Sequence, residues 1–246
     1  VCGGVSRTEA WRPVIMADSP PGSVSIVVPA YAEQHRIGRA VRELRALSRN
    51  FPRLREILVI VEPSGDRTAD VARTEAAGDP AVTVQEHTTH RGKGFAVRTG
   101  MLAAAGDIVF FMDTDLSVPL RFVPDFVQHL DSHPGTAVAI GSRRHSGSNI
   151  TRRQHPFREG AGRLFNHAVR ALGLSASKDT QCGFKAFRRE AARRIFSGAG
   201  IDGFAFDAEA LFLAKRLGLR VDELPVEWIN DEDTKFHALR DGWRSF

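Results

Sequence analysis

The chain has 246 residues, of which 42% are hydrophobic and 26% charged, and a formal net charge of +5. This length and composition suffice for one domain with a substantial core, and no apolar run approaches the ~18–20 residues of a membrane-spanning helix. The positive charge is concentrated in residues 143–194, where thirteen Lys and Arg stand against three acidic residues. This region is therefore expected to attract anions.

The two cysteines, Cys2 and Cys182, offer neither a disulfide framework nor the spacing of metal ligands, which is typical of a reducing compartment. The first residues lack the charged and apolar regions of a signal peptide. We therefore expect a cytoplasmic protein, with peripheral contact to an anionic membrane surface as one explanation of the basic region. The sequence shows no zinc-finger spacing, aromatic ribonucleoprotein motif or basic zipper, so no nucleic-acid partner is expected.

Residues 1–22 contain several glycines and prolines without a steady period and are expected to form a mobile N-terminal extension. After them, short β-branched and apolar runs alternate with segments of helical periodicity. The expected strands are 23–28, 57–61, 82–84, 108–112, 137–140 and 219–226. The expected helices are 37–47, 68–77, 94–105, a helix after 119 that ends at 130, 157–172, and two helices that end at 195 and 217.

This alternation predicts an α/β fold with a mostly parallel central sheet and helices on both faces. The domain is expected to span residues 23–230, followed by a C-terminal tail at 231–246. The ligand crevice of such a sheet lies beyond the carboxyl ends of its strands. Four loops rich in polar residues or glycine should therefore meet on one rim: 29–33, 62–66, 91–94 and 113–115.

The strand at 108–112 is wholly apolar and ends abruptly in Asp113, Thr114 and Asp115. Residues two apart on an extended chain point the same way, so both carboxylates can face one divalent cation such as Mg²⁺ or Mn²⁺. The alternative is a solvated turn in which the acidic residues cap the next helix. The position of the pair on the predicted rim favours the cation.

Lys93 lies between two glycines at the start of the third helix. Gly92 and Gly94 permit close backbone approach to a phosphate, and the helix offers its amino end. The spacing is not that of a Walker loop, which has glycine where His87 stands and Ser or Thr where Gly94 stands. The alternative is a turn that binds nothing.

Two further segments, 179–187 and 203–209, combine polar and aromatic residues. Asp179 is the best carboxylate for orienting or activating an acceptor, with a helix or turn cap as the alternative. Asp207 and Glu209 are candidate partners of the arginines in the basic region. The phenylalanines of both segments are expected to belong to the core.

The order of these motifs resembles that of the family 2 inverting glycosyltransferases of the GT-A fold, above all the polyprenyl-phosphate sugar synthases such as dolichyl-phosphate glucosyltransferase. The resemblance covers roughly residues 24–235, and its most specific motifs are 179–187 and 206–209. It implies a nucleotide-sugar site that contains Pro29, Tyr31, Glu33, Glu62, Ser64, Lys93, Asp113 and Gln181. It also implies Mg²⁺ or Mn²⁺ on Asp113 and Asp115, and the catalytic residues Asp179, Arg143, Arg153 and Arg158.

The resemblance implies transfer of a hexose to a polyprenyl phosphate or another phosphate-bearing acceptor. UDP-glucose is the first candidate for the donor and GDP-mannose is the second. Because an acceptor phosphate is already anionic, arginines that hold it in line matter more than a strong base. Two alternatives stay open: a soluble transferase that acts on a small-molecule acceptor, and a nucleotide-sugar-binding module with weakened catalysis.

The chain departs from the family pattern around the first two strands. Ala32 replaces the family's Asn, and Val61 and Glu62 replace tandem aspartates, while Pro63 stands in place of the following glycine. The first of those aspartates typically contacts the base in relatives. Val61 therefore leaves the identity of the nucleotide open, although Ser64 remains in register.

Overall fold

The computed structural model describes residues 22–150, 177 and 179–229. Several sequence-based predictions lie outside these residues: nearly all of the N-terminal extension, the helix at 157–172, the side chains of Arg153 and Arg158, and the tail at 231–246. The predicted domain boundaries accordingly stay predictions.

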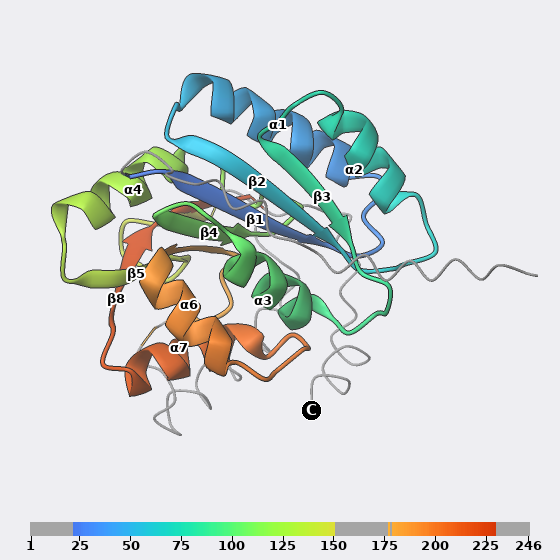
Figure 1. The fold of residues 1–246 in the computed structure, drawn as a ribbon. Coiled ribbons are helices and arrows are strands. Elements are labelled where there is room, and N and C mark those ends of the chain that lie inside the picture. The colour runs from blue at the N-terminus through green and yellow to red at the C-terminus, as the bar shows by residue number, and fades with distance from the viewer. Residues whose placement is uncertain (1–21, 151–176, 178, 230–246) are drawn as a thin grey trace, which may run out of the picture.

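The described residues form an α/β fold with a mostly parallel sheet, which confirms the predicted class (Figure 1). The seven strands of the main sheet are β1 (Val24–Ala30), β2 (Leu54–Val61), β3 (Val82–Glu86), β4 (Ile108–Met112), β5 (Thr136–Ser142), β7 (Phe184–Arg188) and β8 (Arg220–Pro225). Their order is β3-β2-β1-β4-β7-β5-β8. A second, two-stranded sheet pairs β6 (Asn149–Ile150) with β9 (Glu227–Trp228).

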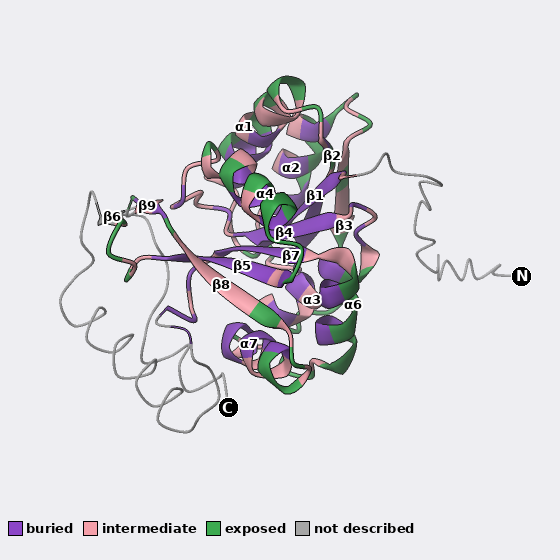
Figure 2. Cartoon of the chain, turned by 90° about the vertical axis from the view of Figure 1, so that its left-hand side faces the viewer, coloured by how far each residue is buried: buried purple, intermediate pink, exposed green. Residues whose placement is uncertain are grey.

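Helices cover both faces of the main sheet, as predicted. They are α1 (Ile37–Asn50), α2 (Thr68–Ala76), α3 (Lys93–Ala103), α4 (Phe122–Ser132), α6 (Arg189–Gly198) and α7 (Phe206–Arg216). Apolar side chains of α1, α2 and α4 share one core cluster, and those of α3, α6 and α7 share the other. Figure 2 shows the central strands buried between these two layers, the edge strands β3 and β8 partly exposed, and the outer sides of the helices exposed. Two-sided burial explains why strands such as β4 are continuously apolar.

Strand β7 is the one element of the sheet that the sequence did not predict. Its side chains go to both faces, because Phe184 and Ala186 belong to one core cluster and Phe187 to the other. Lys185, which lies between Phe184 and Ala186 in the sequence, is also fully buried. Because this lysine interrupts the apolar run, the sequence of the segment does not look like that of a buried strand. The strand runs antiparallel to both neighbours, β4 and β5.

The antiparallel direction of β7 has a direct effect on the rim. The strands β4 and β5 are followed by Asp113 and Arg143 at their carboxyl ends, whereas β7 begins at that same end of the sheet. Residues 179–183, which lead into β7, therefore lie between the acidic turn and the arginine. Topology alone thus brings the acidic turn, residues 179–183 and Arg143 to one end of the sheet.

Asp222 on β8, the edge strand next to β5, stabilises this edge of the sheet through its carboxylate. Its carboxylate accepts a hydrogen bond from Thr136 Oγ1 over 2.7 Å and from Arg220 Nε over 2.9 Å, and it lies 2.9 Å from His129 Nε2. Burial alone would raise the pKa of Asp222, but these partners, with Arg220 first, lower it to about 2. Asp222→Asn should therefore lower the free energy of unfolding at pH 7 by about 2 kcal/mol.

Because the pKa of Asp222 is depressed in the folded state, this stabilisation is complete above about pH 4 and is lost as the pH falls towards 2. Urea unfolding at pH 7 and at pH 3 should show the difference between the wild type and the variant shrinking with acidification. Asp70→Asn is the control, since the Asp70 side chain is 69% exposed and only 3.6 Å from Arg73. An equal loss at both pH values for Asp222→Asn would contradict the assignment.

Candidate active site

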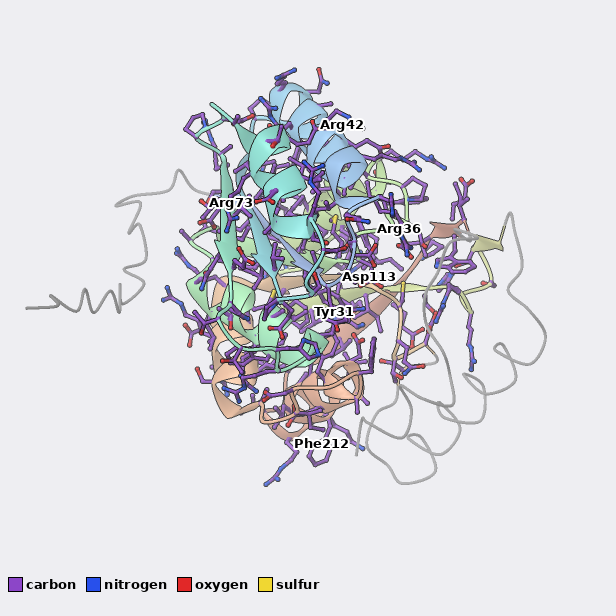
Figure 3. All side chains as sticks on the ribbon, turned by 90° about the vertical axis from the view of Figure 1, so that its right-hand side faces the viewer. Tyr31, Arg36, Arg42, Arg73, Asp113 and Phe212 are labelled. Atoms are coloured by element: carbon purple, nitrogen blue, oxygen red, sulfur yellow. The ribbon has the colours of Figure 1, made fainter. Side chains whose placement is uncertain are left out.

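The carboxyl end of β1 carries the first predicted nucleotide residues. The Tyr31 ring, labelled in Figure 3, is half exposed and stacks on His90 with ring centroids 4.4 Å apart. The carbonyl oxygen of Pro29 accepts a hydrogen bond from Thr114 Oγ1 over 2.9 Å, which ties this end of β1 to the acidic turn. Glu33 pairs with Arg36 over 2.9 Å. The structure thus brings Tyr31 and Pro29 to the rim and gives Glu33 a partner within its own loop.

Ala32 adopts the left-handed backbone conformation, with φ +55°. This region is strained for alanine and is favoured by Asn among the residues other than glycine. The observation gives a physical reason for the Asn that stands here in the family pattern. Alanine in place of Asn at position 32 therefore costs backbone conformational energy. Because Asn is uncharged, this difference leaves the charge of the site unchanged.

The loop after β2 is held by Asp66, which precedes the first residues of α2. Asp66 Oδ1 accepts hydrogen bonds from Ser64 Oγ over 2.6 Å and from the backbone N–H and the hydroxyl of Thr68. Burial alone would raise the pKa of Asp66, but these hydrogen bonds lower it. Ser64, a predicted nucleotide-sugar residue, is thus hydrogen-bonded within the loop.

Glu62 has only 1% of its surface exposed, and its carboxylate is surrounded by donors from residues 87–92. The backbone N–H groups of Arg91 and Gly92 donate to Glu62 Oε2 over 2.6 and 2.9 Å. His87 Nδ1 lies 2.6 Å from the other oxygen, and His90 Nδ1 lies 3.1 Å from Oε2. Burial raises the pKa of Glu62, but the hydrogen bonds, that of His87 first, bring it below its ordinary value. Glu62 therefore holds the turn that precedes α3.

The glycines around Lys93 have a structural reason that the sequence did not reveal. Gly92 has φ +123°, and a Cβ there would lie 2.6 Å from the carbonyl oxygen of Asp202. A Cβ on Gly94 would also collide with the backbone of Ile201. Both glycines thus let the loop at 200–203 pack on the start of α3. Arg91 and Arg98 then hold this loop through their ion pairs with Asp202.

Lys93 itself reaches the acidic turn. Its Nζ lies 2.6 Å from Asp113 Oδ1, and Figure 3 labels Asp113 at the centre of this face. Burial alone would lower the pKa of Lys93, but the negative charges of Asp113 and Asp207 raise it. Burial raises the pKa of Asp115, and the neighbouring charge of Asp113 raises it further. Two carboxylates and one lysine therefore lie close enough together for their charges to interact.

The acidic turn packs directly on the segment before β7. The Asp113 backbone N–H donates to the Gly183 carbonyl oxygen over 3.1 Å. A Cβ added to Gly183 would lie well inside van der Waals contact of both carboxylate oxygens of Asp113. Gly183 is therefore required by the position of Asp113 and not by its own backbone conformation.

Gly183→Ala is expected to displace the Asp113 carboxylate and to lower turnover by roughly 100-fold, since a misplacement of about 1 Å at a reacting centre costs that much. Initial rates at saturating donor and metal would measure the effect. Gly198→Ala is the matched control, because a Cβ there meets nothing within 4 Å, and it should retain wild-type activity. Near wild-type turnover of Gly183→Ala would show that the position of Asp113 does not matter.

Arg143 and Asp179 form a bidentate pair. Arg143 Nε and Nη2 each donate to Asp179 over 2.7 Å, and the Arg143 backbone N–H donates to the same carboxylate over 3.0 Å. Asp179 is completely buried. Burial alone would raise its pKa, but Arg143 lowers it. The guanidinium carbon also lies 5.5 Å from the centre of the Trp228 ring.

The pair lies close enough to the acidic turn for their charges to interact. Burial alone would lower the pKa of Arg143, but Asp179 first, and Asp113 as well, raise it. Cys182, in the segment before β7, is buried, and burial followed by the charge of Asp179 raises the pKa of its thiol to about 12. Gln181 is half buried in the same segment. Of the predicted site residues, Lys93, Asp113, Arg143 and Asp179 thus lie in one region.

One buried ion pair in this region was not predicted. Lys185 Nζ pairs with Asp207 at the start of α7 and also donates to the Cys182 carbonyl oxygen over 2.6 Å. Among the described residues, the partners of Asp207 and Glu209 are not the arginines that the sequence suggested. Glu209 accepts hydrogen bonds from the backbone N–H groups of Gly200 and Ile201 over 2.9 Å. The only sequence signal for the new pair was that both residues lie in the two most specific motifs.

The donor set at the acidic turn fits a hard divalent cation. Asp113 and Asp115 offer carboxylate oxygens, which Mg²⁺ and Mn²⁺ prefer. Within 22–150, 177 and 179–229, no group of three or more His, Cys, Asp or Glu side chains is arranged to hold a metal. A magnesium ion that takes its other ligands from water and substrate phosphates usually has one or two carboxylate ligands.

None of the helices within 22–150 and 179–229 has both the length and the apolar composition of a membrane span.

Sequence comparison with known proteins places the chain in a family. The sequence model described as Glycosyl transferase family 2 matches residues 25–196. A dolichyl-phosphate beta-glucosyltransferase of Drosophila melanogaster is 33% identical, over 89% of this chain and 71% of the relative. A relative of the same name from Trichomonas vaginalis is 32% identical, over 86% of this chain and 65% of its own length. The chain therefore spans about two thirds of the length of these relatives.

Solved structures show the same fold. The glucosyl-3-phosphoglycerate synthase of Mycobacterium tuberculosis in complex with uridine diphosphate has a TM-score of 0.65 and 23% identity, over 88% of this chain and 74% of that one. The mannosyl-3-phosphoglycerate synthase of Rubrobacter xylanophilus has a TM-score of 0.65 and 22% identity, over 91% and 70%. These similarities confirm the predicted GT-A fold.

Proposed function

The chain belongs to glycosyl transferase family 2, and from this premise we propose that it transfers glucose from UDP-glucose to a polyprenyl phosphate with inversion at the anomeric carbon. The observation that supports this most directly is the shared site: Asp113 and Asp115 lie on one side of residues 179–183, and Arg143 lies on the other. The curated relatives named above are dolichyl-phosphate beta-glucosyltransferases. GDP-mannose is the second candidate donor.

On the donor side, Asp113 and Asp115 would hold a Mg²⁺ or Mn²⁺ ion. When bound, the ion supplies Lewis-acid stabilisation of the charge that develops on the leaving diphosphate. Lys93 adds a positive charge beside the same oxygens, and Glu62 keeps the turn before Lys93 in place. The exposed face of Tyr31 is available for stacking on the base.

On the acceptor side, Arg143 would bind the incoming phosphate. Two of its five N–H donors are used by the Asp179 side chain, and the other three have no hydrogen-bond partner within 22–150, 177 and 179–229, so a ligand can take them. Asp179 fixes the plane of the guanidinium and, with a lowered pKa, is a poor proton acceptor. An anionic phosphate can attack without a base, so we assign Asp179 a positioning role. Arg153 and Arg158 remain predicted partners of the phosphate outside the described residues.

A donor and acceptor screen tests the proposal. The protein is incubated with Mg²⁺ or Mn²⁺, UDP-glucose or GDP-mannose, and either a polyprenyl phosphate in detergent or a water-soluble phosphate monoester. Release of the nucleoside diphosphate and mass spectrometry of the product are measured. We expect a glucosyl lipid phosphate that is sensitive to mild acid. Turnover of the soluble acceptor alone, together with failure to float with anionic vesicles, would replace the lipid acceptor by a small molecule.

A further inference from the structure

Five charged side chains form a compact cluster around the acidic turn: Asp113, Asp115, Asp207, Lys93 and Lys185. Lys93 Nζ lies 2.6 Å from Asp113 Oδ1, and Lys185 pairs with Asp207. The ammonium groups of both lysines lie over the same ring of Phe111, at 5.9 and 5.1 Å from its centroid. The paired groups are in direct contact, so their charges affect one another strongly.

The two lysine side chains differ in conformational freedom. Lys185 is completely buried and is held by both Asp207 and the Cys182 carbonyl oxygen. The Lys93 side chain is 23% exposed, lies at the first residue of α3, and ends in a flexible stem of four carbons. Lys93 can therefore change its partner while Lys185 stays in place.

The net charge of this cluster affects how tightly it binds a divalent cation. With all five groups ionised, three carboxylates and two ammonium groups give a net charge of −1. A divalent cation would turn this into +1 as long as the ammonium of Lys93 stays beside Asp113. The diphosphate of a sugar nucleotide brings the missing negative charge, and it also offers Lys93 new oxygens. Each ligand therefore favours the binding of the other.

We propose that Lys93 makes cation binding conditional on the sugar nucleotide. In the nucleotide-free protein its ammonium competes for Asp113 with the divalent ion, and on donor binding it passes from Asp113 to the diphosphate. This inference rests on the proposed metal-dependent transfer and adds an order to it: the ion is retained only together with the nucleotide. By linkage, the ion must strengthen nucleotide binding by the same factor.

Mn²⁺ binding to the full chain, measured by calorimetry with and without UDP, tests this inference without any turnover. In the wild type, we expect UDP to strengthen Mn²⁺ binding by roughly tenfold or more, because a unit charge beside a divalent ion has at least this effect even in a water-like dielectric. Lys93→Met removes the charge and keeps most of the side-chain length. It should bind Mn²⁺ about tenfold more tightly without UDP, and the effect of UDP should shrink.

Lys93→Arg is the matched control, since it keeps the positive charge and should keep the weak Mn²⁺ binding of the nucleotide-free wild type. Unchanged or weaker Mn²⁺ binding by Lys93→Met without UDP would overturn the inference, provided that circular dichroism shows a folded variant. Asp115→Asn separates this failure from that of the proposed function. If Asp115→Asn binds Mn²⁺ and UDP as the wild type does, the acidic turn is not the metal site, and both proposals fall.

Discussion

Asp115→Asn is expected to lower glucosyl transfer by about a thousandfold, which corresponds to about 4 kcal/mol of transition-state stabilisation. The substitution keeps the size of the side chain and its acceptor for the Ser117 N–H, which donates to Asp115 over 2.9 Å. It removes one of two carboxylates that can hold the ion at the leaving diphosphate. Initial rates over a range of Mg²⁺ and Mn²⁺ concentrations would measure the loss and show whether high metal concentrations restore activity.

This loss should occur without loss of stability. Burial and the charge of Asp113 both raise the pKa of Asp115, so its negative charge is unfavourable in the folded protein and its removal should leave the melting temperature unchanged or higher. Asp125→Asn, at an exposed acidic residue in the first turn of α4, is the control for removal of one charge. An Asp115→Asn enzyme with more than about a tenth of wild-type activity would rule out the metal role.

Asp179→Asn is expected to cost about 3 kcal/mol of stability and to lower kcat/KM for the acceptor by roughly 100-fold. Three N–H groups of Arg143 point at this carboxylate, and an asparagine would turn an NH₂ group towards them. Arg143 would lose the partner that sets its plane, so the acceptor phosphate would no longer be held in line. Binding of UDP should change little.

Two comparisons make this prediction specific. Asp131→Asn removes a second Arg–Asp pair, with Arg53, whose side chains are 33% and 47% exposed, and should cost less than about 1 kcal/mol. The pH dependence of kcat separates positioning from base catalysis. A positioning role leaves the shape of the profile unchanged in Asp179→Asn, whereas loss of its acidic limb would show that Asp179 accepts a proton.

The parts of the fold that the sequence predicted are those governed by local pattern. The apolar run of β4, the helical periodicity of α1 and the polar loops after β1 and β2 all depend on near neighbours in the chain. Parallel pairing then follows from the lengths of the connections. Together these rules brought Lys93 and Asp113 to one rim, where the structure has them 2.6 Å apart.

The parts that were missed depend on contacts between distant segments. Lys185 could be recognised as a strand residue only once its partner Asp207, 22 residues later, was known. The four groups that contact the Glu62 carboxylate come from residues 25 to 30 positions further along the chain. No periodicity encodes such pairs, because a buried charge is permitted only by the particular group that neutralises it.

The antiparallel strand β7 also sets the spacing between the acidic turn and Arg143. One strand separates β4 from β5, so the chain segments that carry the acidic turn and the arginine are two inter-strand spacings apart, about 10 Å. Backbone hydrogen bonds fix this gap, and side-chain substitutions can hardly widen or narrow it. Divergence of such an enzyme towards bulkier acceptors should therefore proceed by lengthening the segments outside the sheet, while the spacing between the acidic turn and Arg143 is inherited unchanged.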